Sequence, residues 1–208
     1  MPKVSKNWMT FMIIAMCVGS ILIIKKSVGN SHKFPPSMNS TKVQGDPAAV
    51  LKIVEYIDFE CAACSQGASQ LMDFIEKNPK AVRLEVKYFP LTIHEHSFEV
   101  ARYAECAAQQ DKFWSVYHLL LERQSQWQKR SNALSIIDAW LKEIGLDSRK
   151  LETCLRDEHI DKLILKSKEE GWSLGVRSTP TYFINGEMSV GLYALSDALD
   201  KYYAGLYN

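Results

Sequence analysis

The feature that most constrains this chain is a pair of cysteines, Cys61 and Cys64, between a predicted strand and a predicted helix. Residues 51–58, LKIVEYID, have the length and the β-branched and aromatic content of a strand buried in a sheet. Residues 62–78 place apolar side chains at helical spacing and end before Pro79, where a helix is expected to stop. The spacing puts both sulfurs on one face of the first helical turn, close enough to form a disulfide.

The start of a helix favours a reactive thiolate at Cys61, because unpaired backbone N–H groups and the helix dipole stabilise negative charge there. Such sites lower a cysteine pKa to roughly 3.5 to 7.5. We therefore expect Cys61 to exchange with a partner's sulfur and Cys64 to resolve the mixed disulfide. A structural disulfide is one alternative, although so short a loop gains little stability from closure. A zinc site with His94 and His96 is another, but the second short-spaced cysteine pair of a usual site is missing, so no metal is predicted.

The remaining pattern predicts an α/β fold with helices inserted between its two halves. A second strand at 82–89 closes a βαβ unit whose two strands are parallel. Residues 95–172 are helical in pattern throughout. Thr181–Ile184 and Glu187–Val190 flank an Asn-Gly dipeptide, which is typical of a two-residue β-hairpin. A last helix is expected over about 194–206.

The N-terminal segment predicts a membrane anchor followed by a linker. Residues 8–24 carry no charge and are flanked by lysines, a length at the short end of the roughly 17 to 25 residues that a membrane helix needs. The apolar run continues past its small residues, which favours an uncleaved anchor over 1–26 rather than a cleaved signal peptide. Lipidation at Cys17 and a buried core helix are alternatives, although a core helix normally shows a polar face. Residues 27–47, with three prolines, predict a flexible linker, and 48–208 the folded domain.

The overall charge argues against a nucleic-acid partner. The chain has 25 lysines and arginines against 24 aspartates and glutamates, a net charge of +1. No strong field therefore attracts a polyanion.

The chain resembles the DsbA-like thiol oxidoreductases of the thioredoxin superfamily. The matching stretches are GDPAAVLKIVEYIDFECAAC, KYFPLTIHEHSFEVARYAECAAQQDKFWSVYHLLL and GWSLGVRSTPTYFINGEMSVGLY. They span about residues 45–208, and the three motifs in this order are specific to that family. The resemblance implies a thioredoxin fold with a helical domain inserted at about 95–172.

The resemblance also implies roles for three residues besides the cysteines. Glu55 matches the family's buried acidic residue, which can relay the proton of Cys64; a glutamate at a strand edge facing water is the alternative. Thr179 and Pro180 match the cis-proline loop, which faces the dithiol and offers backbone groups to an extended substrate. An ordinary trans proline is the alternative there.

Cys106 and Cys154 match a second cysteine pair that bridges helices in many relatives, although each alone is equally compatible with a small buried residue. The bridge would stabilise the fold by about 4 kcal/mol in the chain-entropy model. Structural disulfides persist outside the cytosol, so the pair indicates an exported domain whose anchor has its N-terminus inside.

The implied function is the introduction of disulfide bonds into exported, cysteine-containing polypeptides. The expected location is the periplasm, at the inner membrane through residues 8–24. The implied partner is a membrane quinone-linked reoxidant, DsbB-like or vitamin K epoxide reductase-like, and no cofactor is required. Ala62-Ala63 lacks the proline and the histidine or tyrosine often seen between the family's cysteines, so the strength of oxidation stays open. A reductase or isomerase on the same fold, and a non-catalytic module that binds metal or a partner, are the alternatives.

Overall fold

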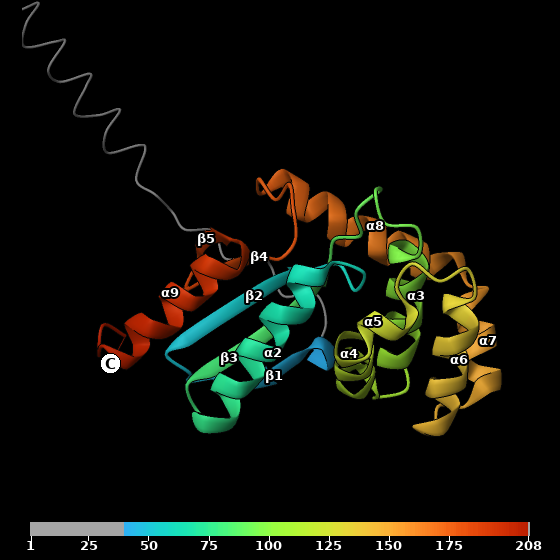
Figure 1. The fold of residues 1–208 in the computed structure, drawn as a ribbon, viewed down its shortest axis with the longest axis horizontal. Helices are drawn as coiled ribbons and strands as arrows, with labels where there is room; N and C mark the ends of the chain where they lie inside the picture. The colour runs from blue at the N-terminus through green and yellow to red at the C-terminus, as the bar shows by residue number, and fades with distance from the viewer. Residues whose placement is uncertain (1–39, 208) are drawn as a thin grey trace, which may run out of the picture. The chain divides into compact units, whose positions relative to one another are not determined.

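The structure is a computed structural model that describes residues 40–207 (Figure 1). The predicted anchor at 8–24 and residues 27–39 of the predicted linker lie outside the described residues. Among the residues that are described, none of the helices is long and apolar enough to cross a membrane.

A five-stranded mixed sheet forms the centre of the fold, with the strand order β1-β3-β2-β4-β5. β2 and β3 are parallel, as the βαβ pattern predicts, and every other neighbouring pair is antiparallel. β2 is central and almost wholly buried, which explains its run of apolar residues. The strands are β1 Val43–Gly45, β2 Leu51–Ile57, β3 Val82–Tyr88, β4 Thr181–Ile184 and β5 Glu187–Val190.

The helices cover both faces of the sheet and form the inserted domain between β3 and β4. α2 and α9 pack together on one face, and the end of α8 covers the other, where Gly171 lies against the ring of Tyr56. In Figure 1 the helices α3 to α7 gather beyond one end of the sheet. The helices are α2 Ala62–Lys77, α3 Ser97–Ala108, α4 Phe113–Glu122, α5 Gln124–Trp127, α6 Ala133–Glu143, α7 Ser148–Leu155, α8 Glu158–Ser173 and α9 Gly191–Tyr203, with a 3-10 turn η1 at Ser40–Lys42.

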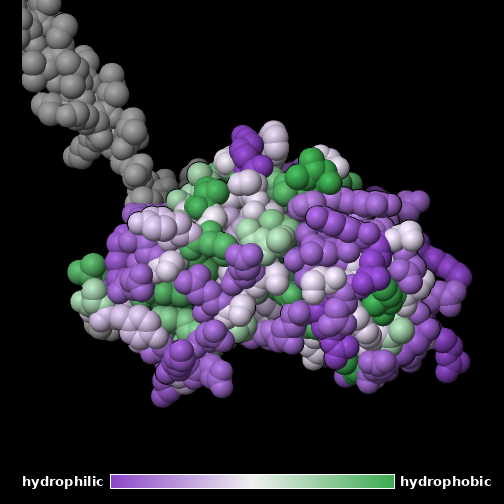
Figure 2. Space-filling model, viewed as in Figure 1, coloured by the Kyte–Doolittle hydropathy of each residue, from purple (hydrophilic) through white to green (hydrophobic). Residues whose placement is uncertain are grey.

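The polarity of the surface differs between the inserted helices and the rest of the fold. On the face that Figure 2 shows, hydrophilic residues cover most of the inserted helices, and apolar residues gather nearer the middle of the molecule. The inserted helices turn their apolar side chains inward, as α6 does with Ala133, Ile137 and Leu141. The apolar side chains of the insertion therefore belong to the same core as those on the α2 side of the sheet.

Two boundaries differ from the sequence predictions. The linker predicted over 27–47 is wrong at its end, because η1 and β1 occupy residues 40–45 and Val43 pairs with Glu85 of β3. A three-residue edge strand ending in glycine carries too little periodicity to be recognised beside a proline-rich segment. The last helix begins at Gly191 rather than near residue 194, directly after β5.

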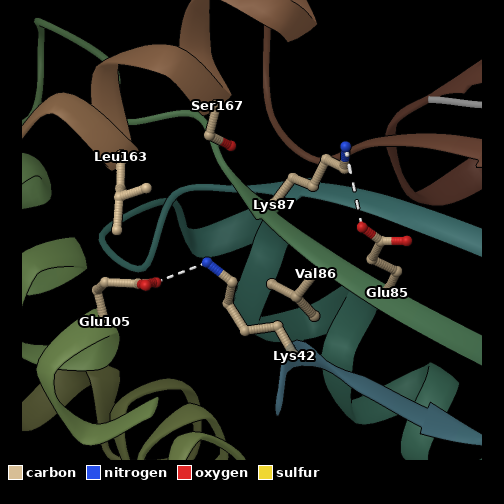
Figure 3. Close-up of a pocket in the computed structure, with 7 residues that line it drawn as sticks. All are labelled: Lys42, Glu85, Val86, Lys87, Glu105, Leu163 and Ser167. Carbon is tan, nitrogen blue, oxygen red and sulfur yellow. Dashed lines mark hydrogen bonds and ion pairs between the residues drawn. The ribbon is translucent and has the colours of Figure 1, made fainter. Parts of the chain in front are cut away.

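A disulfide joins two helices within the insertion, and a buried ion pair fixes the insertion to the rest of the fold. Cys106 of α3 and Cys154 of α7 are joined in a disulfide. Lys42 Nζ lies 2.6 Å from Glu105 Oε2, at the edge of a small cavity between the sheet, α3 and α8 (Figure 3). Lys42 also lies over the ring of Tyr88, 4.3 Å from its centroid. The ion pair thus links the segment before β1 to the first inserted helix.

We expect Lys42→Met to lower the free energy of unfolding by about 3–5 kcal/mol, because the buried carboxylate of Glu105 would lose its cation. Urea unfolding followed by circular dichroism measures the change. The double variant Lys42→Met/Glu105→Gln should recover most of the loss. Lys201→Met, which breaks an exposed pair with Asp197, is the control and should have little effect. Wild-type stability in Lys42→Met would contradict a structural role for the pair.

Candidate active site

The two cysteines stand on either side of the point where α2 begins. Cys61 is the N-cap residue, with an extended backbone, and Cys64 lies in the first turn of the helix. Both are free thiols in this structure. Cys61 keeps 9% of its surface exposed, whereas Cys64 is fully buried. A partner's sulfur can therefore reach Cys61 but not Cys64.

The surroundings make the two sulfurs ionise very differently. The thiol of Cys64 contributes most to lowering the pKa of Cys61, which falls from 9.0 to about 5. Thr179 and the backbone amides of Ala63 and Cys64 lower it further, against the opposing effect of burial. Burial raises the pKa of Cys64 well above its usual value, and the neighbouring Cys61 and Glu55 raise it more. One sulfur is thus an anion at neutral pH and the other a thiol.

The predicted proline loop lies against the first cysteine. The peptide bond between Thr179 and Pro180 is cis. In its protonated form, the thiol of Cys61 donates to the carbonyl oxygen of Thr179 at 3.3 Å. The carbonyl of Pro180 accepts from the amide of Gly191 at 2.9 Å, which ties the loop to the start of α9. The loop and the dithiol, 118 residues apart in sequence, therefore form one site.

Glu55 lies on the face of β2 that turns toward α2 and is fully buried. The alternative of a glutamate facing water is therefore wrong. The hydroxyl of Tyr117 donates to Glu55 Oε2 at 2.8 Å. Burial raises the pKa of Glu55 from 4.5 to about 7, although Tyr117 and Tyr182 oppose the rise. A carboxyl group with such a pKa can both give and take a proton near neutral pH.

Asp58, which the sequence analysis did not single out as a site residue, organises the turn before Cys61. Its Oδ1 accepts from the amide of Glu60 at 2.8 Å, and its Oδ2 accepts from the amide of Leu91 at 2.8 Å. The Nδ1 atom of His94 also lies 2.8 Å from Oδ2. One buried carboxylate thus holds the loop after β3 against the active-site turn.

The two histidines considered as zinc ligands have other partners. His94 contacts Asp58, and the ring of His96 contacts the carbonyl of Arg130 through Nε2 at 3.0 Å. The amide of His96 donates to the carboxylate of Glu60 at 2.8 Å. Across residues 40–207, no three His, Cys, Asp or Glu side chains come together as a metal-binding group.

Gln124 of α5 is a further residue that the sequence analysis missed. Its side-chain amide donates to the carbonyls of Phe59 at 2.7 Å and of Cys61 at 2.9 Å. The inserted domain therefore holds the backbone of the reactive turn directly. No local pattern could identify Gln124, because its partners lie more than sixty residues earlier in the chain.

The sequence model described as Thioredoxin matches residues 37–201 of the chain. The chain belongs to the thioredoxin family.

Solved structures agree with a DsbA-like form of this fold. Wolbachia pipientis alpha-DsbA1 is 20% identical with a TM-score of 0.70, over 85% of this chain and 97% of that one. BdbD from Bacillus subtilis is 19% identical with a TM-score of 0.67, over 80% of this chain and 95% of that one. Pseudomonas aeruginosa DsbA2 is 25% identical with a TM-score of 0.60, over 79% of this chain and 96% of that one.

Relatives by sequence include much longer proteins. The Na(+)/H(+) antiporter NhaA 3 of Salinispora tropica is 29% identical over 82% of this chain, but the match covers 26% of the antiporter. The antiporter NhaA of Herminiimonas arsenicoxydans is 27% identical over 73% of this chain and 23% of its own length. The chain thus spans about a quarter of the length of these curated relatives.

We expect the chain with Cys61 and Cys64 reduced to show a thiolate titration with a midpoint at about pH 5, because Cys61 ionises there while Cys64 stays protonated. Thiolate absorbance at 240 nm between pH 3 and 7 measures it, below the range in which an ordinary cysteine such as Cys17 ionises. Cys61→Ser should remove this transition. Cys64→Ala should move it upward, since the Cys64 thiol contributes most to the low pKa. A midpoint near that of a free cysteine would show that the site does not activate Cys61.

Glu55→Gln should stabilise the folded chain relative to wild type by about 3 kcal/mol at pH 8, and the difference should vanish near pH 4. The pKa of Glu55 is 4.5 in the unfolded chain and about 7 in the folded chain, so the folded chain keeps the proton to a higher pH. Wild type therefore loses stability over this interval, and glutamine has no proton to lose. Urea unfolding of both proteins measures the difference, in which contributions from other groups cancel. A difference that does not change with pH would contradict the raised pKa.

Proposed function

We propose that this chain is a thiol-disulfide oxidoreductase that passes a disulfide from Cys61 and Cys64 to cysteine pairs in exported polypeptides. The observation that carries the proposal is the position of two free cysteines at the start of one helix, Cys61 partly exposed and Cys64 buried, which lowers the pKa of the first and raises that of the second. A structural disulfide or a passive binding module has no need of one acidic, accessible sulfur beside one buried thiol.

The proposed reaction begins with the oxidised pair. A thiolate of the client attacks the sulfur of Cys61, the bond between the two cysteines breaks, and its electron pair goes to the sulfur of Cys64. Glu55 supplies the proton that makes Cys64 a thiol. The second thiolate of the client then attacks the client sulfur bound to Cys61, which leaves as a stable thiolate. The client gains a disulfide and the enzyme becomes a dithiol.

We favour oxidation over reduction because an ionised Cys61 stabilises the reduced enzyme, which makes its disulfide a stronger oxidant. The dipeptide Ala62-Ala63 adds no charged group to this effect. The reduction potential, measured against glutathione buffers, separates the candidates. A value nearer about −120 mV than about −270 mV supports an oxidase, and the reverse supports a reductase.

We further propose that the domain works outside the cytosol. The disulfide between Cys106 and Cys154 supports an oxidising compartment. Together with the anchor predicted at 8–24, it supports our proposal of a location in the periplasm at the inner membrane. Tethering would raise its effective concentration near a quinone-linked reoxidant, DsbB-like or vitamin K epoxide reductase-like. Ion transport is not carried over from the antiporters, because the match covers a quarter of their length.

We expect Cys61→Ser to abolish oxidation of a reduced, unfolded client such as a two-cysteine peptide, because it removes the attacked sulfur. Cys64→Ser should form a stable mixed disulfide through Cys61 with a client peptide whose cysteine is activated as a thionitrobenzoate disulfide, because the Cys61 thiolate displaces thionitrobenzoate and the resolving thiol is gone. Non-reducing electrophoresis and mass spectrometry measure both outcomes. A chain that holds zinc stoichiometrically and exchanges no thiols would support the non-catalytic module instead.

A further inference from the structure

Two tyrosines from different parts of the fold face the carboxyl group of Glu55. Tyr117 comes from α4 of the inserted domain and donates its hydroxyl hydrogen to Oε2 at 2.8 Å. Tyr182 comes from β4 and lies directly opposite Glu55 in the antiparallel pairing of β4 with β2. Both tyrosines are fully buried. The carboxyl group is thus enclosed from the insertion on one side and from the sheet on the other.

The hydroxyl of Tyr182 reaches toward the helix that carries Cys64. Gly67 lies one turn after Cys64 on α2, and a Cβ atom at Gly67 would come within 2.2 Å of the Tyr182 hydroxyl. Only glycine leaves room for this oxygen. Among the described residues, neither that hydroxyl nor Glu55 Oε1 forms a hydrogen bond of normal geometry, although Tyr182 lies opposite Glu55 and lowers the pKa of its carboxyl group. The space beneath Cys64 therefore contains one carboxylate oxygen that is held less firmly than the other.

The two oxygens of Glu55 are consequently unequal. Oε2 is held by the hydroxyl of Tyr117, whereas Oε1 is left to exchange a proton. A proton relay needs one oxygen of the carboxyl group to be held and the other to exchange the proton. The hydrogen bond to the first oxygen keeps the second at a constant position relative to the reacting sulfur. Tyr182 lies opposite Glu55 in the sheet and its hydroxyl lies against Gly67, one turn after Cys64, so the carboxyl group and the sulfur share one buried region, and the charge of Glu55 raises the pKa of Cys64.

We propose that Tyr117 is a positioning residue for disulfide exchange, which orients Glu55 so that its free oxygen delivers the proton to Cys64. The inference rests on the proposed function. When the bond between Cys61 and Cys64 breaks, the electron pair goes to Cys64 and the proton comes from Glu55. Glu55 then regains a proton from solvent. The inserted domain would in this way supply part of the reaction machinery through α4.

A groove in the surface lies next to the buried pair. It lies between α2 and α4, and Tyr117 is among the residues that line it, together with Ser65, His118 and Glu122. The titratable groups that face Glu55 are Cys64 from α2, Tyr117 from α4 and Tyr182 from β4, while β3 contributes the apolar Val86. Tyr117 thus both donates a hydrogen bond to Glu55 and lines this groove.

The test is the pH dependence of exchange in Tyr117→Phe, which removes only the hydroxyl. The oxidised full chain is mixed with a single-cysteine peptide between pH 5 and 9, and the rate is corrected for the thiolate fraction of the peptide. Wild type should lose rate above about pH 7, as Glu55 gives up its proton, and Glu55→Gln should lack this inflection. Tyr117→Phe should move the inflection upward by about one pH unit, because the anion of Glu55 loses a hydrogen bond. Its rate below the inflection should fall severalfold.

Tyr56→Phe is the matched control. The hydroxyl of Tyr56 donates to Glu170 at 2.7 Å on the opposite face of β2, so its loss removes a bond of the same kind away from the dithiol. Its pH profile should equal that of wild type, even if both variants melt at a lower temperature. Tyr182→Phe serves as a second variant should Tyr117→Phe fail to fold, and it should also shift the inflection upward.

The outcomes separate this inference from the proposed function. If Tyr117→Phe and Tyr182→Phe superpose on wild type while Cys61→Ser is inert, the positioning role is wrong and the oxidoreductase proposal stands. A shift of equal size in Tyr56→Phe would also overturn the inference, because a general loss of stability would then explain it. If Cys61→Ser still exchanges thiols, the proposed function itself fails.

Discussion

The boundary between the central strand β2 and helix α2 sets the chemistry of the whole site. Cys61 stands just outside the helix, where the thiol of Cys64 and the backbone amides of the first turn favour its anion. Cys64 stands one turn inside, where burial and the charge of Glu55 oppose ionisation. The same element thus gives two identical side chains opposite protonation states. The proline loop, Asp58 and Gln124 all serve to keep this boundary in place.

Local patterns were sufficient for most of the framework. The strands at 51–57 and 181–184, the helix after Cys61 and the parallel βαβ unit follow from spacing and turn residues, because neighbouring residues alone determine them. The burial of Glu55 and the pairing of Cys106 with Cys154 came only from the family resemblance. Strand phase and cysteine pairing depend on distant parts of the chain, which no short window contains.

Contacts made by the inserted domain could not be predicted in the same way. Tyr117 and Gln124 lie in ordinary amphipathic patterns, and their importance appears only when α4 and α5 fold against the dithiol. Asp58 ends a strand and resembles any turn residue until Leu91 and His94 close on it. The functional surroundings of the cysteines are therefore largely built from side chains that sequence alone presents as structural.

The hydrogen bonds from Gln124 to Phe59 and Cys61 have a consequence for the choice of clients. They leave the backbone beside the reactive sulfur little freedom to adjust. Three sulfur atoms must come nearly into line during each transfer, so the adjustment has to be made by the incoming polypeptide. In the proposed reaction this selects nascent or unstructured chains over folded ones, since only a flexible segment can bring its thiolate into line with a sulfur whose position is fixed.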